Sequence, residues 1–465
     1  MKDKPTARTR PRRRSPAILD RINPHAAGID CGAAEHFVAV PPASDPDPVR
    51  SFPTFTADLV RLADWLIACG VTTVAMEATG VYWIPIFELL EERGLAVLLV
   101  NARHVKNVSG RKTDVSDCEW LRDLHTVGLV RGSFRPTKTI VALRAYLRHR
   151  QTLVETASTY VHRMQKALTQ MNLQRPLVIS DLTGQTGMRI LRAIVAGQRD
   201  PAQLAQHRDR RCHATLAQVT AALTGHYRPE HLFVLQQNLE LFDMCQTQLA
   251  ACDRAVAAHV ATLTATVAPP AEALPAPRTR ARPRGHEPTF EMRAPLHHLT
   301  GVDLTQIDGL GPYTVMKLVS EIGTDMSRWP SAKHFTSWLT LAPQNKISGG
   351  RLLRARTVPS ANRAAATFRM AAMSLGRTQT ALGAFYRRLA FRTGKPKAIT
   401  AVARKLAVLV YRMLKGEIRY QDLGAAAYEA QHRARTLQHL RKRATSLGFE
   451  LVNLATGELA SDGVS

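Results

Sequence analysis

Short apolar runs alternate with helical patterns over residues 26–136. Four of these runs have the length of buried strands and are bounded by glycine or proline signals: 26–30, 36–40, 71–76 and 95–100. Strands that alternate with helices are typical of an α/β fold. We therefore predict an α/β domain over residues 23–136, preceded by a basic, flexible tail over residues 1–22.

Apolar residues recur every seven positions in two arrays in the middle of the chain. The arrays are Ile140, Leu147, Val154, Val161 and Leu168, and then Leu235, Phe242, Leu249, Val256 and Leu263. This spacing predicts two long helices with apolar seams. The companion positions of the first seam hold Leu143, Ala157, Met164 and Met171, and Arg150 interrupts them once. A helical hairpin within one chain and a coiled coil between two subunits fit the pattern equally well. We assign residues 137–268 to this helical, coiled-coil region.

The remaining chain divides by composition. Residues 269–295 are rich in proline and arginine and too charged to pack a core, so we expect a flexible basic linker. Residues 296–428 have helical patterns and a strong basic bias, which predicts a separate helical domain. Residues 429–465 are predicted to form a charged helical tail.

The chain carries a large excess of positive charge. Its 465 residues include 63 lysines and arginines against 37 aspartates and glutamates, a formal net charge of +26. Such an excess indicates a polyanionic partner, with nucleic acid the leading candidate and a merely basic or ribosome-associated protein the alternative.

Other features of the composition exclude several classes of protein. Apolar runs fall short of the roughly 18 residues that a membrane span needs, and no apolar segment follows the basic N-terminal residues as in a secretory signal. The six cysteines contain no C-x-x-C pair, which disfavours zinc and suits a reducing compartment. We expect a cytoplasmic protein with no membrane partner.

Acidic residues end two of the predicted strands and begin a later helix. Asp30 lies in G-I-D-C-G and Glu77 in M-E-A-T-G, while Asp114 and Asp117 are three residues apart and share one face if their segment is helical. Carboxylates that converge in this way can hold two Mg²⁺ ions, which neutralise charge on both oxygens of a phosphodiester reaction. For any one of these acids, a helix cap or a surface charge is the alternative interpretation.

Two glycine-containing turns follow in the C-terminal domain. Gly309 and Gly311 precede a helix, so their backbone N–H groups could meet a phosphate as in helix-hairpin-helix modules, although a plain interhelical turn is the alternative. Ser348 precedes Gly349 and Gly350, and several arginines follow. A serine exposed there could act as a nucleophile, with a simple Ser-Gly loop as the alternative.

These motifs resemble those of one family. The segments M-E-A-T-G-V-Y-W at 76–83 and R-K-T-D-V-S-D at 111–117 are similar to the RuvC-like, RNase H-fold domain of DEDD transposases, the insertion sequence 110 family. The resemblance implies that Asp30, Glu77, Asp114 and Asp117 are metal ligands. Residues 307–373 are similar to the C-terminal domain of the same transposases, whose S-G-G serine links covalently to DNA, which points to Ser348. The chain departs from the family pattern at 356–362, where a lysine and a glycine are missing.

The resemblance carries further expectations. It implies an α/β plus all-α fold: an RNase H-like (RuvC-like) mixed-sheet N-terminal domain, central coiled-coil helices, and a helical C-terminal domain with a helix-hairpin-helix-like element. It implies a transposase or recombinase that cuts and joins DNA to move an insertion sequence, with two Mg²⁺ ions, or Mn²⁺ in their place. The partners implied are donor and target DNA, a noncoding bridge RNA, and other copies of the chain in a dimer or a dimer of dimers, in the nucleoid-associated cytoplasm of a bacterium.

The residues expected to contact nucleic acid are basic or are glycines of the two turns. They are Lys112, Gly309, Gly311, Lys333, Gly349, Gly350, Arg351, Arg354, Arg356 and Arg363. Two other functions compete with the recombinase. A Holliday-junction-type, structure-specific endonuclease would need the carboxylates but no serine, and a non-catalytic nucleic-acid-binding scaffold would need neither.

Overall fold

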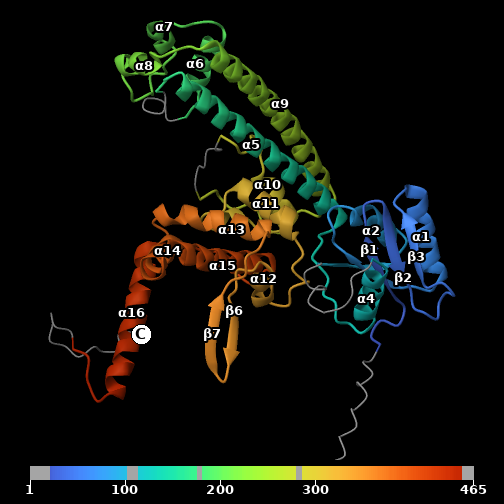
Figure 1. Cartoon of the computed structure of the whole chain (residues 1–465). Helices are drawn as coiled ribbons and strands as arrows, with labels where there is room; N and C mark the ends of the chain where they lie inside the picture. Colours follow the sequence, from blue (N-terminus) through green and yellow to red (C-terminus); the bar gives the residue numbers. More distant parts are fainter. Residues whose placement is uncertain (1–20, 102–113, 175–180, 279–284, 453–465) are drawn as a thin grey trace, which may run out of the picture. The chain divides into compact units, whose positions relative to one another are not determined.

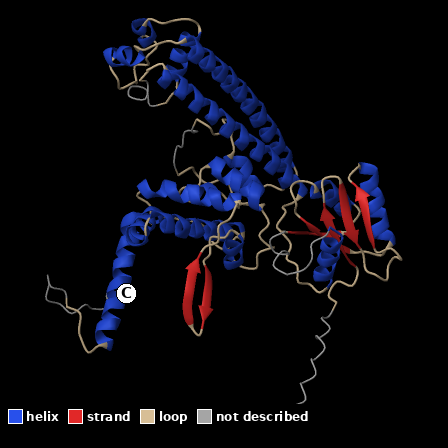
Figure 2. Ribbon diagram, in the orientation of Figure 1, coloured by secondary structure: helices blue, strands red, loops and turns tan. Residues whose placement is uncertain are grey.

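The computed structural model describes residues 21–101, 114–174, 181–278 and 285–452. The chain divides into two compact units, 1–135 and 136–465, which we describe separately (Figure 1). The first is an α/β unit, and the second is helical apart from one β-hairpin (Figure 2). The α/β plus all-α expectation is therefore confirmed at the level of fold class.

The first unit is built on a five-stranded mixed sheet. Its strands are β1 (Ala26–Cys31), β2 (Glu35–Ala39), β3 (Val49–Pro53), β4 (Thr73–Glu77) and β5 (Ala96–Val100), in the order β3-β2-β1-β4-β5. β1 is parallel to β4 and β4 to β5, whereas β1 to β3 are antiparallel. All four predicted strands are present within a residue or two of their expected bounds. β3 was missed because its short, half-polar sequence ends in proline, as suits a strand at a sheet edge.

Helices cover both faces of this sheet. α1 (Thr56–Ala68) and α2 (Trp83–Glu92) pack on one face, where Ile29, Met76, Leu62 and Leu90 are fully buried. α4 (Asp114–Thr126) packs on the other, with Leu121 against Ala75 and Val100. Apolar side chains therefore fill both layers, and the ends of the strands are left for polar residues.

α4 lies unusually close to β1. A Cβ atom added at Gly28 would meet the backbone carbonyl of Cys118 and come within 2.5 Å of the amide nitrogen of Arg122. Arg122 is buried, and its guanidinium donates to the carbonyl of Val40 at 3.0 Å. The absence of a side chain at residue 28 thus sets the distance between helix and sheet.

Two long helices dominate the second unit. α5 (Lys138–Gln170) and α9 (Pro229–Ala265) lie side by side, and the predicted seam residues Leu147, Leu168, Leu235 and Val256 are buried. Of the two interpretations left open by the heptads, the structure shows the helical hairpin within one chain. A coiled coil between subunits stays a prediction.

A small helical head joins the two long helices at one end. It contains α6 (Gln185–Val195), α7 (Pro201–Ala205) and α8 (Leu216–Leu223) (Figure 1). Their apolar side chains form one core with the adjoining ends of α5 and α9, including Met164, Ile194 and Leu235. The two heptad arrays do not extend into this region, and each short helix contributes only a few apolar residues to the shared core.

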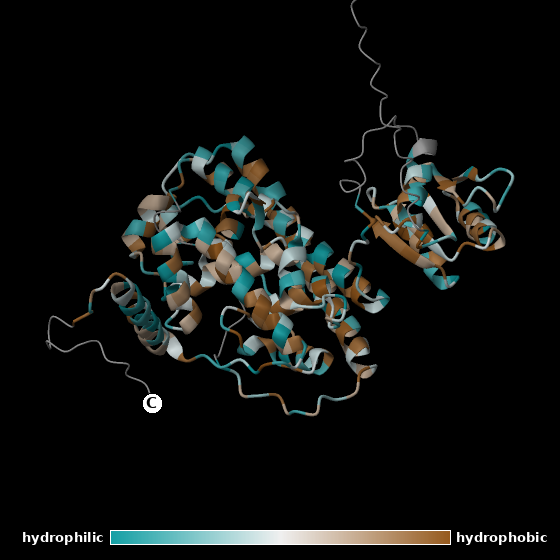
Figure 3. Cartoon of the chain, turned by 90° about the horizontal axis from the view of Figure 1, so that it is seen from below, coloured by the Kyte–Doolittle hydropathy of each residue, from teal (hydrophilic) through white to brown (hydrophobic). Residues whose placement is uncertain are grey.

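The rest of the second unit is a helical domain that carries the β-hairpin. Its helices are α10 (Arg293–Thr300), η2 (Leu304–Gln306), α11 (Pro312–Ile322), α12 (Ala332–Trp338), α13 (Arg363–Ser374), η3 (Leu375–Arg377), α14 (Ala381–Thr393), α15 (Lys395–Leu414) and α16 (Gly424–Ser446). The hairpin consists of β6 (Gln344–Ser348) and β7 (Arg351–Arg356). α16 is mostly hydrophilic and has no buried residue (Figure 3). No helix in the described ranges has both the length and the apolar character to cross a membrane.

Residues 269–295, which we predict to be a flexible basic linker, contact the helical domain at some points. Arg278 is ion-paired with Asp308 at 3.1 Å and with Asp422 at 3.5 Å, and it donates to the carbonyl of Gln306. Met292 is buried. The described part of this segment therefore contacts the helical domain through Arg278, and its flexibility stays a prediction.

Arg150, the residue that interrupts the apolar seam, connects three parts of the second unit. Its side chain is only 3% exposed and is ion-paired with Asp253 of α9 at 2.5 Å. It also donates to the carbonyl of His286 at 2.8 Å and to the hydroxyl of Tyr313 on α11 at 3.0 Å. The interruption in the heptad is thus the point where the long helices are joined to the C-terminal domain.

Replacing Arg150 with methionine should destabilise the second unit by about 3–5 kcal/mol, because the carboxylate of Asp253 would stay partly buried without its cation. Urea unfolding measures this loss. Combining Arg150→Met with Asp253→Leu should recover much of it, and Arg163→Met, at an exposed position of the same helix, should change stability by less than about 0.5 kcal/mol. Equal effects at Arg150 and Arg163 would show that the network does not hold the helices together.

Candidate functional site

Asp30 and Glu77 lie at the ends of neighbouring parallel strands. Ile29 pairs with Met76 in the register of β1 and β4, so the next residues, Asp30 and Glu77, lie opposite each other. Side chains alternate between the faces of a strand, and Ala75, two residues before Glu77, packs against α4. Both carboxylates are therefore on the face that α4 covers.

The start of α4 lies at the same end of the sheet. The other end of the helix is bonded to the beginnings of the strands: the amide of Asn23 donates to the carbonyl of Thr126 at 2.9 Å, and Thr73 contacts the ring of His125. α4 consequently runs antiparallel to β1, which brings its first turn, with Asp114 and Asp117, toward the ends of β1 and β4. The side chain of Asp114 and all of Lys112 lie outside the described residues.

The charges of these acids affect two thiols nearby. Burial raises the pKa of Cys31 to about 12, and the carboxylates of Asp30 and Glu77 add to that rise. Burial also raises the pKa of Cys118, at the start of α4, to about 12, and the carboxylate of Asp30 adds to that rise. The carboxylate of Asp30 thus lies close enough to both thiols to affect their pKa values. We call the ends of β1 and β4, together with the first turn of α4, the carboxylate corner. A cation bound there would offset its negative charge.

The chemistry of this corner suits a hard divalent cation. Asp30, Glu77 and Asp117 are each partly exposed, and carboxylate oxygens are the preferred ligands of Mg²⁺ and Mn²⁺. Within the described part of the chain, no group of three or more His, Cys, Asp or Glu side chains is already spaced to hold a metal ion. The donor types therefore fit a metal, and the ligand set itself stays a prediction.

Ser348 is the last residue of β6, at the exposed tip of the hairpin. Gly349 and Gly350 form the two-residue turn with φ of 53° and 73°. A tight turn of this kind needs left-handed backbone at both positions, which glycine adopts without strain. We expected either a Ser-Gly loop or an exposed nucleophile, and the structure shows an exposed serine on a defined hairpin.

A β-bulge decides which side chains share a face with Ser348. In a regular strand Arg351 and Arg354, three residues apart, would face opposite sides. The register shifts between Lys346 and Ile347, leaving Leu353 as the additional residue. Cross-strand partners share a face, and the pairs on this one are Ser348 with Arg351, Lys346 with Arg354, and Gln344 with Arg356.

The hairpin therefore has one cationic face and one apolar face. Arg351, Arg354 and Arg356 all lie beside Ser348 on the cationic face, as does Lys346, which the sequence analysis missed although it is two residues from the serine. The apolar face exposes Ile347, Leu352 and Leu353. The serine thus lies on the same face as four exposed cationic side chains.

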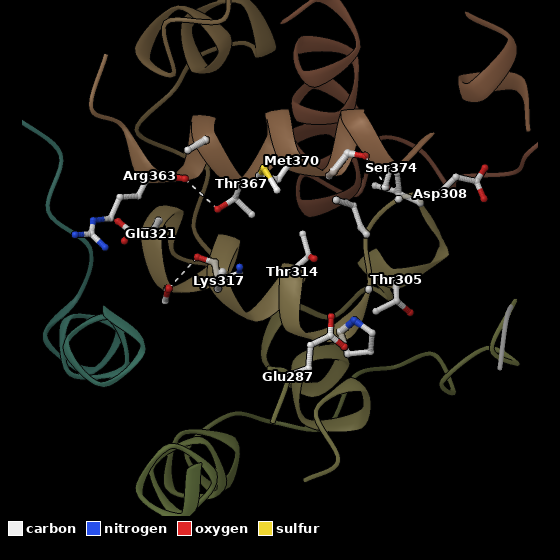
Figure 4. Close-up of a pocket in the computed structure, with 18 of the residues that line it drawn as sticks. Glu287, Thr305, Asp308, Thr314, Lys317, Glu321, Arg363, Thr367, Met370 and Ser374 are labelled. Atoms are coloured by element: carbon white, nitrogen blue, oxygen red, sulfur yellow. Dashed lines mark hydrogen bonds between the residues drawn. The ribbon is translucent and has the colours of Figure 1, made fainter. Parts of the chain in front are cut away.

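Three other predicted residues line one cleft in the second unit. Gly309, Gly311 and Arg363 border a cavity of about 790 Å³ between α11 and α13, which also contains Lys317 and Thr314 (Figure 4). Gly311 caps α11, so the N-terminus of that helix opens here. Lys333, by contrast, is exposed at the start of α12, and no contact places it in this cleft.

Lys317 was not identified from the sequence. Burial lowers the pKa of this lysine, while the carboxylate of Glu287 acts in the opposite direction. Its ammonium lies 4.6 Å from the centre of the Tyr313 ring. The apolar helix pattern around Lys317 gave no signal, because only the fold shows that its side chain reaches the cleft.

Two family models match the sequence. A model described as a transposase matches residues 27–173, which include the carboxylate corner. A second, described as a transposase of the IS116/IS110/IS902 family, matches residues 303–387, which include the hairpin and the cleft. No curated protein matches the chain.

Divalent cations should stabilise the first unit through Asp30 and Glu77. The melting temperature of the wild type should rise as Mg²⁺ or Mn²⁺ is added. At a metal concentration about one hundred times the dissociation constant, the free energy of unfolding should increase by about 2.7 kcal/mol. Asp30→Asn and Glu77→Gln should be as stable as the wild type or more so without metal, since they remove repulsion, and should gain little with it.

Glu35→Gln, which removes an exposed acid from β2, is the matched control and should respond to metal as the wild type does. A metal-dependent rise of the same size in Asp30→Asn would contradict a metal site at this corner.

Proposed function

The chain belongs to the insertion sequence 110 family of transposases, and we propose that it cuts and joins DNA with two groups, the carboxylate corner of the first unit and Ser348. Transposases act on DNA strands to move a mobile element, so the general activity follows from the family. The proposal concerns which residues perform it and how.

The observation that carries the serine half is the cationic face of the hairpin. Arg351, Arg354 and Lys346 share that face with Ser348 and are exposed. Arginine forks can hold two oxygens of one phosphate, which would present the phosphorus atom to the serine oxygen. The opposite face carries no charge, so DNA would approach from the side of the serine.

The reaction proposed for Ser348 is a transfer between two esters. Its Oγ forms a bond to phosphorus and loses its proton, while the bond to one deoxyribose oxygen breaks and that oxygen takes up a proton. A hydroxyl at the end of another strand then reverses these steps and releases the serine. Since one phosphodiester replaces another, no external energy source is needed.

The carboxylate half would hold the metal. Asp30, Glu77, Asp114 and Asp117 are the proposed ligands of Mg²⁺, which Mn²⁺ can replace. Bound there, two such ions would neutralise charge that develops on the attacking and leaving oxygens. The backbone geometry supports this assignment, because the ends of β1 and β4 and the first turn of α4 lie at one end of the sheet.

Subunits and RNA complete the proposal. We place the carboxylates of one subunit and Ser348 of another in one composite site, within a dimer or a dimer of dimers. The resemblance to the family adds a noncoding bridge RNA that selects donor and target DNA. The net charge of +26 is compatible with both nucleic acids. The resemblance to the family also leads us to propose a bacterial, nucleoid-associated location.

Denaturation-resistant protein–DNA adducts should form in the wild type when Mg²⁺, DNA and the cognate RNA are supplied. Ser348→Ala should abolish the adduct, because no other atom takes the place of Oγ, and Asp30→Ala should reduce it at least a hundredfold. Ser360→Ala, which removes another exposed serine of the same domain, is the control and should leave the adduct unchanged.

Metal-dependent nicking that survives Ser348→Ala would favour a Holliday-junction-type endonuclease instead. If all three variants behaved as the wild type in every assay, the chain would be a nucleic-acid-binding scaffold.

A further inference from the structure

The helical head at the end of α5 and α9 lies between the two matched regions. Residues 185–228 contain α6, α7 and α8, and no part of them belongs to residues 27–173 or 303–387. Over this stretch the chain has seven arginines against two aspartates and no lysine or glutamate. The head therefore has a net positive charge that does not depend on the two matched regions.

A hollow of about 510 Å³ opens on this head. It is lined by Gln185, Met188, Arg189, Arg192, Ala193, Ala196 and His207. Five of these residues lie on α6 and Ala196 caps its C-terminus, so they share one face of the helix, where positions three and four residues apart are neighbours. The hollow thus combines two arginines and an imidazole with a floor of small apolar side chains.

The arginines of the hollow are only weakly neutralised. Arg192 is paired with Asp243 at 3.0 Å, but the two side chains are 59% and 44% exposed, and such pairs contribute little in water. Asp209 is hydrogen-bonded mainly to Arg211, and these bonds lower the pKa of its carboxyl to about 2. The charge of Arg189 makes a smaller contribution to this lowering. Positive potential therefore remains over Arg189 and Arg192.

The frame around the hollow is rigid. The opposite face of α6 is buried through Ile190, Leu191 and Ile194. Gly187 packs so closely that an added Cβ would meet the carbonyl of Leu182. Asp200 caps α7, so the segment that carries His207 starts from a fixed point. The cationic groups are thus presented on a preorganised surface rather than on a mobile loop.

We propose that this hollow binds the phosphate backbone of a nucleic acid, as a second contact remote from the strand chemistry. Arg189 and Arg192 would contact consecutive phosphates, and the floor formed by Met188 and Ala196 would lie against the sugar. α5 has 33 residues and is about 50 Å long, so the head and the C-terminal domain contact well-separated parts of a bound molecule. The inference does not rest on Ser348 or on the carboxylates.

Nucleic-acid binding measured in EDTA tests this contact without any cleavage. The full-length protein carrying Ser348→Ala is titrated with a mixed-sequence DNA duplex and, separately, with an RNA duplex of equal length over a range of salt concentrations. Arg189→Gln combined with Arg192→Gln should lower the slope of log affinity against log salt by about 2, since two phosphate contacts are lost. Arg228→Gln combined with Arg254→Gln removes the same charge outside the hollow and should leave the slope unchanged.

If the Arg189/Arg192 variant has a reduced salt slope with only the DNA duplex, or with only the RNA duplex, the result supports the site and identifies which backbone it binds. Equal slopes for the two double variants with both duplexes would overturn the proposal. It would also be overturned if the Arg189/Arg192 variant lost binding only to an acidic polypeptide such as polyglutamate, because the hollow would then be a protein contact. Thermal melting of each variant establishes that the head remains folded.

Discussion

The close packing of α4 on β1 is the constraint on which the candidate site depends. At Gly28 the backbone of the helix occupies the space of a side chain, with the carbonyl of Cys118 in contact. The helix therefore lies close against the strand, and the contacts of its last turn with Asn23 and Thr73 show its direction. The ends of β1 and β4 and the start of α4 then converge, and four acidic residues lie at or next to these three ends.

A comparable constraint operates in the second unit. Arg150 joins α5, α9 and α11 through Asp253 and Tyr313, so the long helices and the C-terminal domain form one body. That body carries the hairpin, whose turn pairs Arg351 with Ser348 and whose bulge at Leu353 brings Arg354 to the same face. In both units, hydrogen bonds and ion pairs of polar groups thus set how the helices that carry the candidate residues are placed. Apolar packing alone would not determine this placement.

Apolar periodicity predicted most of the architecture, because the four buried strands and the seams of α5 and α9 repeat with the period of their element. The convergence of Asp30 and Glu77 was also predictable, since parallel strands end at one edge. The sequence did not reveal β3, the hairpin or the core of the head. A half-polar edge strand and short helices that share a core have weak local signals, and the strands beside the Gly-Gly turn are exposed throughout, so they lack the alternating apolar pattern of a half-buried strand. The bulge changes which face Arg354 and Arg356 occupy, and residue spacing cannot predict this change.

The central claim is that the carboxylates and Ser348 serve one reaction from different subunits. Complementation tests it most directly: Glu77→Gln protein and Ser348→Ala protein are assayed for strand joining alone and after mixing, with metal, DNA and RNA present. The account predicts that each is inactive alone and that the mixture regains activity, because a mixed dimer contains one site with both groups intact. A mixture as inactive as its components, although mixed dimers form, would contradict it.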